Sequence, residues 1–99
     1  MEKNKFHIET YTMPHGIDTW LAGDVSAPSD DEEQVYKSWL GMVKEFKRDC
    51  PKSRLRNYQT RRTAEQAFCD RESSVCSCEW SLPNGEGNYR VTMHVTKAA

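Results

Sequence analysis

An α+β fold is what the sequence predicts: a single domain, residues 1–99, with one amphipathic helix packed on an antiparallel sheet in the order ββαβββ. A chain of 99 residues has room for one domain core. Hydrophobic residues recur three and four positions apart in one central segment, which is the helical period, and alternate with polar residues on both sides of it. Turn-forming Pro, Gly and Asn separate the alternating segments, which is typical of antiparallel hairpins.

Residues 6–13 and 17–25 are the first two predicted strands, and the Pro and Gly of residues 14–16 favour a tight turn between them. Hydrophobic residues of the first strand fall on both faces, so its buried side stays open. The second strand alternates more cleanly, and the face that we expect to be buried carries Ile17, Thr19, Leu21 and Val25. Trp20 lies on the opposite face, where we expect it to be exposed as a binding anchor.

The acidic segment 30–33 marks the start of the predicted helix, because negative charge is favourable in the first helical turn. Ser29 and Glu32 have the spacing of a capping box. The helix is expected to run for about five turns and to end before Pro51, which cannot continue it. Its hydrophobic face, expected to pack on the sheet, carries Val35, Trp39, Met42, Val43, Phe46 and Cys50.

Three more elements are predicted after the helix. Residues 54–63 favour a strand with at least one face in solvent, and residues 64–72 fit either one helical turn or a bulged strand. Residues 75–82 and 89–96 pair as a hairpin across the turn-rich loop 83–88. The buried faces of this hairpin are expected to carry Cys76, Cys78, Trp80 and Leu82, and Tyr89, Val91, Met93 and Val95.

A formal net charge of −1 conceals two opposed charge patches. Residues 1–34 hold eight acids and two bases, whereas residues 44–62 hold eight bases and two acids. The near-neutral total argues against a wholly basic nucleic-acid coat or membrane-surface peptide. The bases of 44–62 fit three interpretations: a solvated helix end with a charged edge strand, a phosphate-binding surface in which Tyr58 stacks on a base, or the rim of a protein interface.

The acidic stretch 30–33 is similarly open to two interpretations. It is a capped helix start, or it presents negative charge to a groove lined by Arg or Lys in a partner, as a mimic of nucleic-acid phosphate would. The candidate partner-binding residues on both patches, together with the tryptophan anchor, are Trp20, Asp31, Glu32, Arg54, Arg56, Tyr58, Arg61 and Arg62.

The four cysteines are predicted to be reduced, metal-free core residues, because the sequence shows no export signal. A zinc site is the alternative, in which Cys76 and Cys78 share a strand face and His7 or His94 approaches, although the Cys-x2-Cys spacing common in such sites is missing. No apolar run reaches the ~20 residues that a membrane span needs. We therefore expect a cytoplasmic protein that contacts no membrane and carries no metal or cofactor.

No catalytic motif stands out, so we expect that the protein is not an enzyme. In its size and ββαβββ order the chain resembles small phage-encoded anti-defence proteins, including anti-CRISPR inhibitors. The resemblance implies a non-enzymatic inhibitor with a protein partner, which blocks a nucleic-acid-handling defence complex by occupying its surface. The alternative is an accessory protein that binds single-stranded nucleic acid through the basic segment 44–62.

Overall fold

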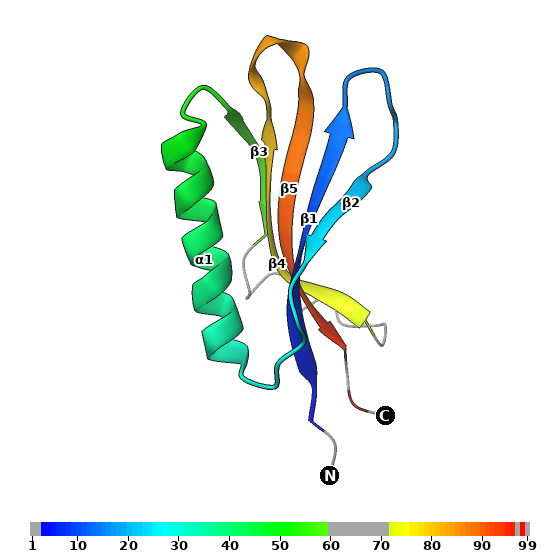
Figure 1. Ribbon diagram of the computed structural model, residues 1–99, viewed down its shortest axis with the longest axis vertical. Helices are drawn as coiled ribbons and strands as arrows, with labels where there is room; N and C mark the ends of the chain where they lie inside the picture. Colours follow the sequence, from blue (N-terminus) through cyan, green and yellow to red (C-terminus); the bar gives the residue numbers. More distant parts are fainter. Residues whose placement is uncertain (1–2, 60–71, 97, 99) are drawn as a thin grey trace.

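The computed structural model describes residues 3–59, 72–96 and 98, and these form the expected α+β fold of one helix on a five-stranded antiparallel sheet (Figure 1). The elements in chain order are β1 (Lys5–Pro14), β2 (Leu21–Val25), α1 (Glu32–Asp49), β3 (Arg54–Gln59), β4 (Glu72–Ser81), the short 3-10 helix η1 (Pro83–Gly85) and β5 (Gly87–Thr96). This order confirms ββαβββ. Arg61, Arg62, Cys69 and most of the ambiguous segment 64–72 lie outside the described residues.

The sheet has the strand order β2-β1-β5-β4-β3, so that β5 lies at its centre. Both expected hairpins, β1 with β2 and β4 with β5, are confirmed. β5 also pairs with β1 in unbroken register from Lys5 opposite Thr96 to Pro14 opposite Gly87. Gly87 is required at this end, because its φ is +113° and a Cβ there would lie 2.1 Å from the carbonyl oxygen of Met13.

The core lies between α1 and one face of the sheet. Side chains of β4 and β5 that point toward α1 are buried, as expected from their alternation: Cys76, Cys78, Trp80, Val91, Met93 and Val95. On β1, whose buried side the sequence left open, Phe6 and Ile8 are buried on the same face. From the helix, Val35, Trp39 and Val43 complete this core. Trp39 is fully buried, and its indole Nε1 donates a hydrogen bond of 3.0 Å to the carbonyl oxygen of Val91, which satisfies its one polar group.

The capping box is not formed, because Asp31 rather than Ser29 caps α1. The Asp31 carboxylate accepts a hydrogen bond of 3.2 Å from the backbone N–H of Gln34. Ser29 is held elsewhere, since its backbone N–H and carbonyl both pair with Phe6 at the start of β1. The helix then runs 18 residues, or five turns, and Cys50 caps its end, as the sequence indicates. No helix of the described residues is long and apolar enough to cross a membrane.

The expectation of a buried face on the second strand is wrong. β2 covers only Leu21–Val25, and all five of its residues are exposed. Ile17, in the loop before it, is 44% exposed, and Val25 is 59% exposed. The physical reason is the position of β2 at the edge of the sheet, where α1 does not reach it (Figure 1). The hydrophobic residues of this strand still alternate with polar ones, but no second layer covers the face that they form.

Candidate functional site

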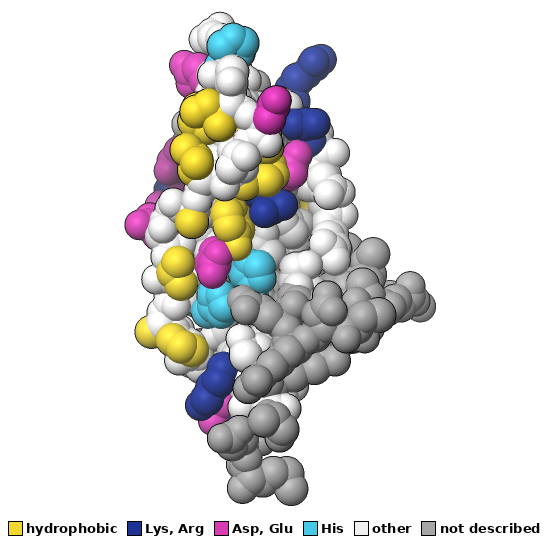
Figure 2. Space-filling model, turned by 90° about the vertical axis from the view of Figure 1, so that its right-hand side faces the viewer, with side chains coloured by type: hydrophobic (Ala, Val, Ile, Leu, Met, Phe, Trp, Pro, Cys, Tyr) yellow, Lys and Arg dark blue, Asp and Glu magenta, His cyan; other side chains and the backbone are white. Residues whose placement is uncertain are grey.

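The face of the sheet opposite α1, which we call the open face, carries polar and ionisable side chains. In β1 and β5 these polar side chains alternate with the core residues. They are His7, Glu9, Tyr11, Arg90, Thr92 and His94. Histidine and acidic side chains gather at the middle of this side of the molecule, near a Lys or Arg side chain (Figure 2). The open face therefore concentrates the groups on which binding or catalysis depends.

Four of these side chains form one hydrogen-bonded group, which we call the His–Glu–Tyr cluster: His7, Glu9, Tyr11 and His94. His7 and His94 are opposite each other in register, and their rings stack with centroids 5.1 Å apart. The Nε2 atom of His7 lies 3.0 Å from Oε1 of Glu9. The Tyr11 hydroxyl donates to the other Glu9 oxygen and lies 2.8 Å from Nε2 of His94. The sheet register thus joins residues from distant parts of the chain.

The cluster lowers the pKa of the Glu9 carboxyl from its ordinary value, chiefly through the hydrogen bond from Tyr11. Partial burial opposes this shift, and His7 and His94 add to it. Glu9 is consequently a carboxylate at neutral pH. Its two oxygens are electron-pair donors that lie 3.0 Å from Nε2 of His7 and 4.0 Å from Nε2 of His94, and only 22% of its side chain is exposed.

Arg90 lies beside the cluster, between two aromatic rings. Its Cζ atom is 4.5 Å from the centroid of the Tyr11 ring and 4.7 Å from that of Trp20. The Nε atom is buried and has no hydrogen-bond partner. Glu79, its register partner on β4, instead pairs with Arg56 at 3.6 Å. Within residues 3–59 and 72–96, no carboxylate forms an ion pair with Arg90.

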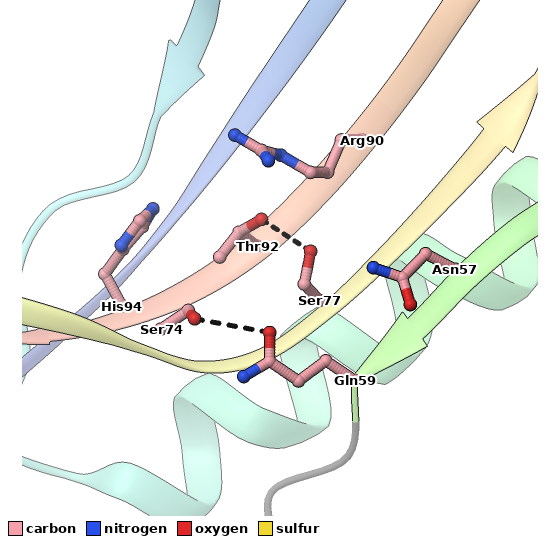
Figure 3. Close-up of a pocket in the computed structure, with 7 residues that line it drawn as sticks. All are labelled: Asn57, Gln59, Ser74, Ser77, Arg90, Thr92 and His94. Carbon is pink, nitrogen blue, oxygen red and sulfur yellow. Dashed lines mark hydrogen bonds between the residues drawn. The ribbon is translucent and has the colours of Figure 1, made fainter. Parts of the chain in front are cut away.

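A hollow of about 430 Å³, which we call the polar groove, lies along the open face next to Arg90. Every residue that lines it is polar, from three strands, and the set is Asn57, Gln59, Ser74, Ser77, Arg90, Thr92 and His94 (Figure 3). The hydroxyls of Ser77 and Thr92 lie 2.8 Å apart, and Ser74 donates to Gln59 at 3.4 Å. The amides, hydroxyls and guanidinium that line the polar groove suit a small polar or anionic ligand better than an apolar one.

The candidate residues from the sequence do not form one surface. Trp20 lies on the open face, where it is half-buried against Arg90 rather than exposed. Asp31 and Glu32 begin α1, whereas Arg54 and Arg56 follow its other end. An α-helix rises 1.5 Å per residue, so the 18 residues of α1 put its two ends about 27 Å apart.

The basic segment is also divided between the two faces of the sheet. The Tyr58 side chain is 44% exposed but lies on the side of α1, with its ring centroid 6.1 Å from that of Trp39. Partial burial raises the pKa of its hydroxyl. Arg56 instead pairs with Glu79, whose side chain is on the open face. Tyr58 and Arg56 therefore do not combine into one stacking and phosphate-binding platform.

The structure separates Cys76 and Cys78 from His7 and His94. Cys76 and Cys78 are fully buried on the α1 side of the sheet, and burial raises the pKa of the Cys78 thiol to about 11. His7 and His94 are on the open face, with the sheet between them and these thiols. A zinc site shared by these two histidines and these two cysteines is therefore geometrically impossible.

Sequence reasoning missed the His–Glu–Tyr cluster and Arg90. Their signal is present, because His7, Glu9 and Tyr11 alternate along β1 and Arg90, Thr92 and His94 along β5. What the sequence lacks is the pairing of β1 with β5, which puts His7 opposite His94. The alternation of residues within one strand does not reveal which residues of a distant strand lie opposite it.

Comparison with known proteins leaves the site to be interpreted from its own geometry. No family model, no curated protein and no solved structure matches this chain.

Proposed function

We propose that the chain is a non-enzymatic binding module that recognises a protein partner through the open face of its sheet. In this proposal an acidic group of the partner enters the polar groove and pairs with Arg90. The observation that carries the proposal is the guanidinium of Arg90, which is fixed by two rings and lacks a carboxylate partner within the described residues. Arg is well suited to bind a carboxylate through two parallel hydrogen bonds.

The surroundings of Arg90 support an anionic ligand. A partly buried cation loses hydration, and its Nε has no hydrogen-bond partner to compensate, so a carboxylate would supply both charge and acceptor atoms. Tyr11 and Trp20 restrict the side chain before the ligand arrives, which lowers the entropy lost on binding. Ser74, Ser77 and the other neutral residues of the groove offer further hydrogen bonds.

A protein fits this face better than a nucleic acid does. Glu9 and Glu79 lie on the same face as Arg90 and would repel a chain of phosphates, whereas a single acidic side chain can approach Arg90 alone. Ile17, Leu21 and Val25, at the adjacent edge, are exposed hydrophobic residues of the kind that protein interfaces cover. The basic segment 44–62 remains the alternative surface for single-stranded nucleic acid.

A finer form of the proposal is an inhibitor of the anti-CRISPR type that occludes a nucleic-acid-handling defence complex. Its support is the resemblance in size and ββαβββ order to such phage-encoded proteins. The exposed acids at the start of α1 also support it, since Asp31 and Glu33 would present negative charge to a basic groove of that complex.

Selection from a random peptide library tests the proposal. We expect the wild-type protein to enrich acidic peptides, and Arg90→Met, which keeps an unbranched side chain between the two rings, to bind them at least tenfold more weakly. Arg48→Met is the matched control, because Arg48 is an exposed arginine on α1, and it should bind like the wild type.

Two outcomes would count against this function. Equal binding by Arg90→Met and wild type would show that the groove is not the recognition site. Sub-micromolar binding of single-stranded oligonucleotides at physiological salt, lost in Arg54→Ala with Arg56→Ala, would favour the nucleic-acid alternative.

A further inference from the structure

We propose that His7, Glu9 and His94 bind one divalent transition-metal ion, and that this ion is Zn²⁺. The inference replaces the expectation of a metal-free chain and is independent of the proposed function. It rests on the position of three ligand-type side chains at the centre of the open face, within the His–Glu–Tyr cluster. Each of the three offers one ligand atom, and these atoms all lie within 4.8 Å of one another.

The distances are close to those of a zinc site. Zn–N and Zn–O bonds are about 2.0–2.2 Å, so that the ligand atoms of a tetrahedral site lie about 3.4 Å apart. His7 Nε2 and Glu9 Oε1 are already 3.0 Å apart, and His94 Nε2 is 4.0 Å from the other oxygen of Glu9. The proposed site therefore requires the side chains to rotate so that the three atoms approach a common ion.

The sheet makes this arrangement rigid. His7 and Glu9 are two residues apart on β1, so their side chains leave the same face, and His94 is opposite His7 on the central strand β5. The alternate residues of these strands are anchored in the core, where Ile8, Met93 and Val95 are at most 5% exposed. Ligands on rigid strands are oriented before the ion arrives, which favours binding.

The donor set favours zinc over the hard cations. Two imidazole nitrogens and one carboxylate oxygen are a common protein ligand set for Zn²⁺, whereas Ca²⁺ and Mg²⁺ require oxygen ligands almost exclusively. The carboxylate of Glu9 would offset one of the two charges of the ion. The side chains are 13% exposed at His7 and 17% at His94, so the site is accessible from solvent yet partly dehydrated.

Tyr11 is a positioning residue in this proposal. Its hydroxyl donates a hydrogen bond to Oε2 of Glu9 and thereby orients this carboxylate, whereas its present contact with Nε2 of His94 would give way to the ion. A partner of this kind orients a ligating carboxylate and raises the affinity of the ion. Because His94 also lines the polar groove, the ion would lie at the edge of that groove and add positive charge beside Arg90.

The test is a titration of the metal-free protein with Zn²⁺ in competition with a chromophoric chelator. Wild type should bind one equivalent with micromolar or tighter affinity. His94→Ala and the nearly isosteric Glu9→Gln should each bind at least tenfold more weakly. His15→Ala is the matched control, because His15 is exposed in the loop before β2 and lies outside the cluster, and it should bind like the wild type.

Two further measurements keep the test decisive. Zn²⁺ should raise the melting temperature of the wild type but not that of His94→Ala, by linkage of binding to folding. Co²⁺ in place of Zn²⁺ should give visible absorption without a thiolate-to-cobalt charge-transfer band, since Cys76 and Cys78 are on the other face of the sheet. The Co²⁺ spectrum is measured on the wild type, so this result does not depend on whether the variants fold.

The proposal is overturned if wild type binds no Zn²⁺ in the micromolar range, if His15→Ala loses as much affinity as His94→Ala, or if Co²⁺ shows thiolate ligation. Failure of this site and failure of the proposed function are distinguishable. Arg90→Met should lose acidic peptides and keep Zn²⁺ binding, because Arg90 is not a ligand.

Discussion

The two faces of the sheet are built by the same strands but differ in almost every physical property. On the side of α1, Ile8 and Val91 are buried with other hydrophobic residues. On the open face, one position away in sequence, Glu9 and Arg90 are ionisable and partly accessible to solvent. Alternation along a strand therefore separates two kinds of surface, since the covered face holds the hydrophobic core and the open face holds the polar and ionisable groups.

This difference implies that substitutions on the two faces have separable effects. On the covered face, a shortened side chain leaves a cavity, whose free-energy cost rises with its volume. On the open face, the cost depends on whether a polar group loses its hydrogen-bond partner. We expect variants of the first kind to unfold the protein and variants of the second kind to change binding at nearly constant stability.

The largest effect is expected from a comparison of two tryptophans. Trp39→Ala should lower the free energy of unfolding by about 3–5 kcal/mol, because it removes a fully buried ring. Trp20→Ala should cost about 1 kcal/mol or less, since the half-buried ring mainly contacts Arg90. Urea denaturation of both variants measures this. Similar losses for the two would mean that the open face also carries the core stability.

A large kinetic difference is expected between two thiols. Burial raises the pKa of Cys78 from 9.0 to about 11, so its thiolate fraction near neutral pH is about a hundredfold below that of an ordinary thiol. Cys78 should therefore be alkylated far more slowly than the half-buried Cys50 in the native protein. Peptide mapping by mass spectrometry after timed exposure to iodoacetamide identifies each site. Equal rates would show that the covered face opens readily.

The same thiol gives a pH dependence of stability. A pKa raised by folding means that the stabilising contribution of Cys78 is fully present below pH 9 and is lost as the pH rises through about 11. We expect the free energy of unfolding to fall over this range, and to fall less in Cys78→Ala. Denaturation of both proteins at several alkaline pH values measures this. Parallel curves would contradict the assignment to Cys78.

A smaller effect is expected at the buried hydroxyl pair of the open face. Thr92→Val removes the partner of the Ser77 hydroxyl, which lies 2.8 Å away, and should cost about 1–2 kcal/mol. Adding Ser77→Ala should recover part of this loss, because no unpaired hydroxyl then remains. Thermal unfolding of the two single variants and the double variant forms the test. Simple additivity would mean that the hydroxyls act independently.

The smallest effect is expected on the solvent side of α1, which belongs to neither face. Gly41 is exposed there, and a Cβ would meet nothing within 4 Å. Gly41→Ala should raise the free energy of unfolding by about 0.5–1 kcal/mol through helix propensity alone. Gly87→Ala is the contrasting variant and should destabilise strongly, because of the close approach to Met13. A loss of stability at Gly41 would indicate a contact that α1 does not otherwise show.

Much of the fold could be predicted because its strongest sequence patterns are local. The hydrophobic period of α1 and the alternation in β4 and β5 give both the element types and their buried faces. The buried face predicted for β2 was wrong, because burial depends on a second layer of structure, which a strand's own sequence does not reveal. The prediction that Ser29 caps α1 was wrong for a similar reason, since the pairing of Ser29 with Phe6 is a tertiary contact.

The candidate site could be predicted much less well, because it depends on register between strands at opposite ends of the sequence. The charge pattern predicted a site at Asp31 and Arg54, but Asp31 precedes α1 and Arg54 follows its other end. The residues that do converge, such as His7 and His94, are separated by most of the chain and carry no local motif. Trp20 was singled out because it lies opposite the predicted hydrophobic face of its strand, but that face is exposed and Trp20 is half-buried.

The central position of β5 has a consequence for how the molecule folds. β5 follows every other strand in sequence, yet it alone hydrogen-bonds to both β1 and β4. Until it inserts, β1 with β2 and β3 with β4 are separate two-stranded units, and neither is expected to be stable by itself. Joining them requires contacts as distant in sequence as Lys5 with Thr96, which makes folding slow for so small a protein. Insertion of this one strand therefore completes the hydrophobic core and the polar open face in the same step.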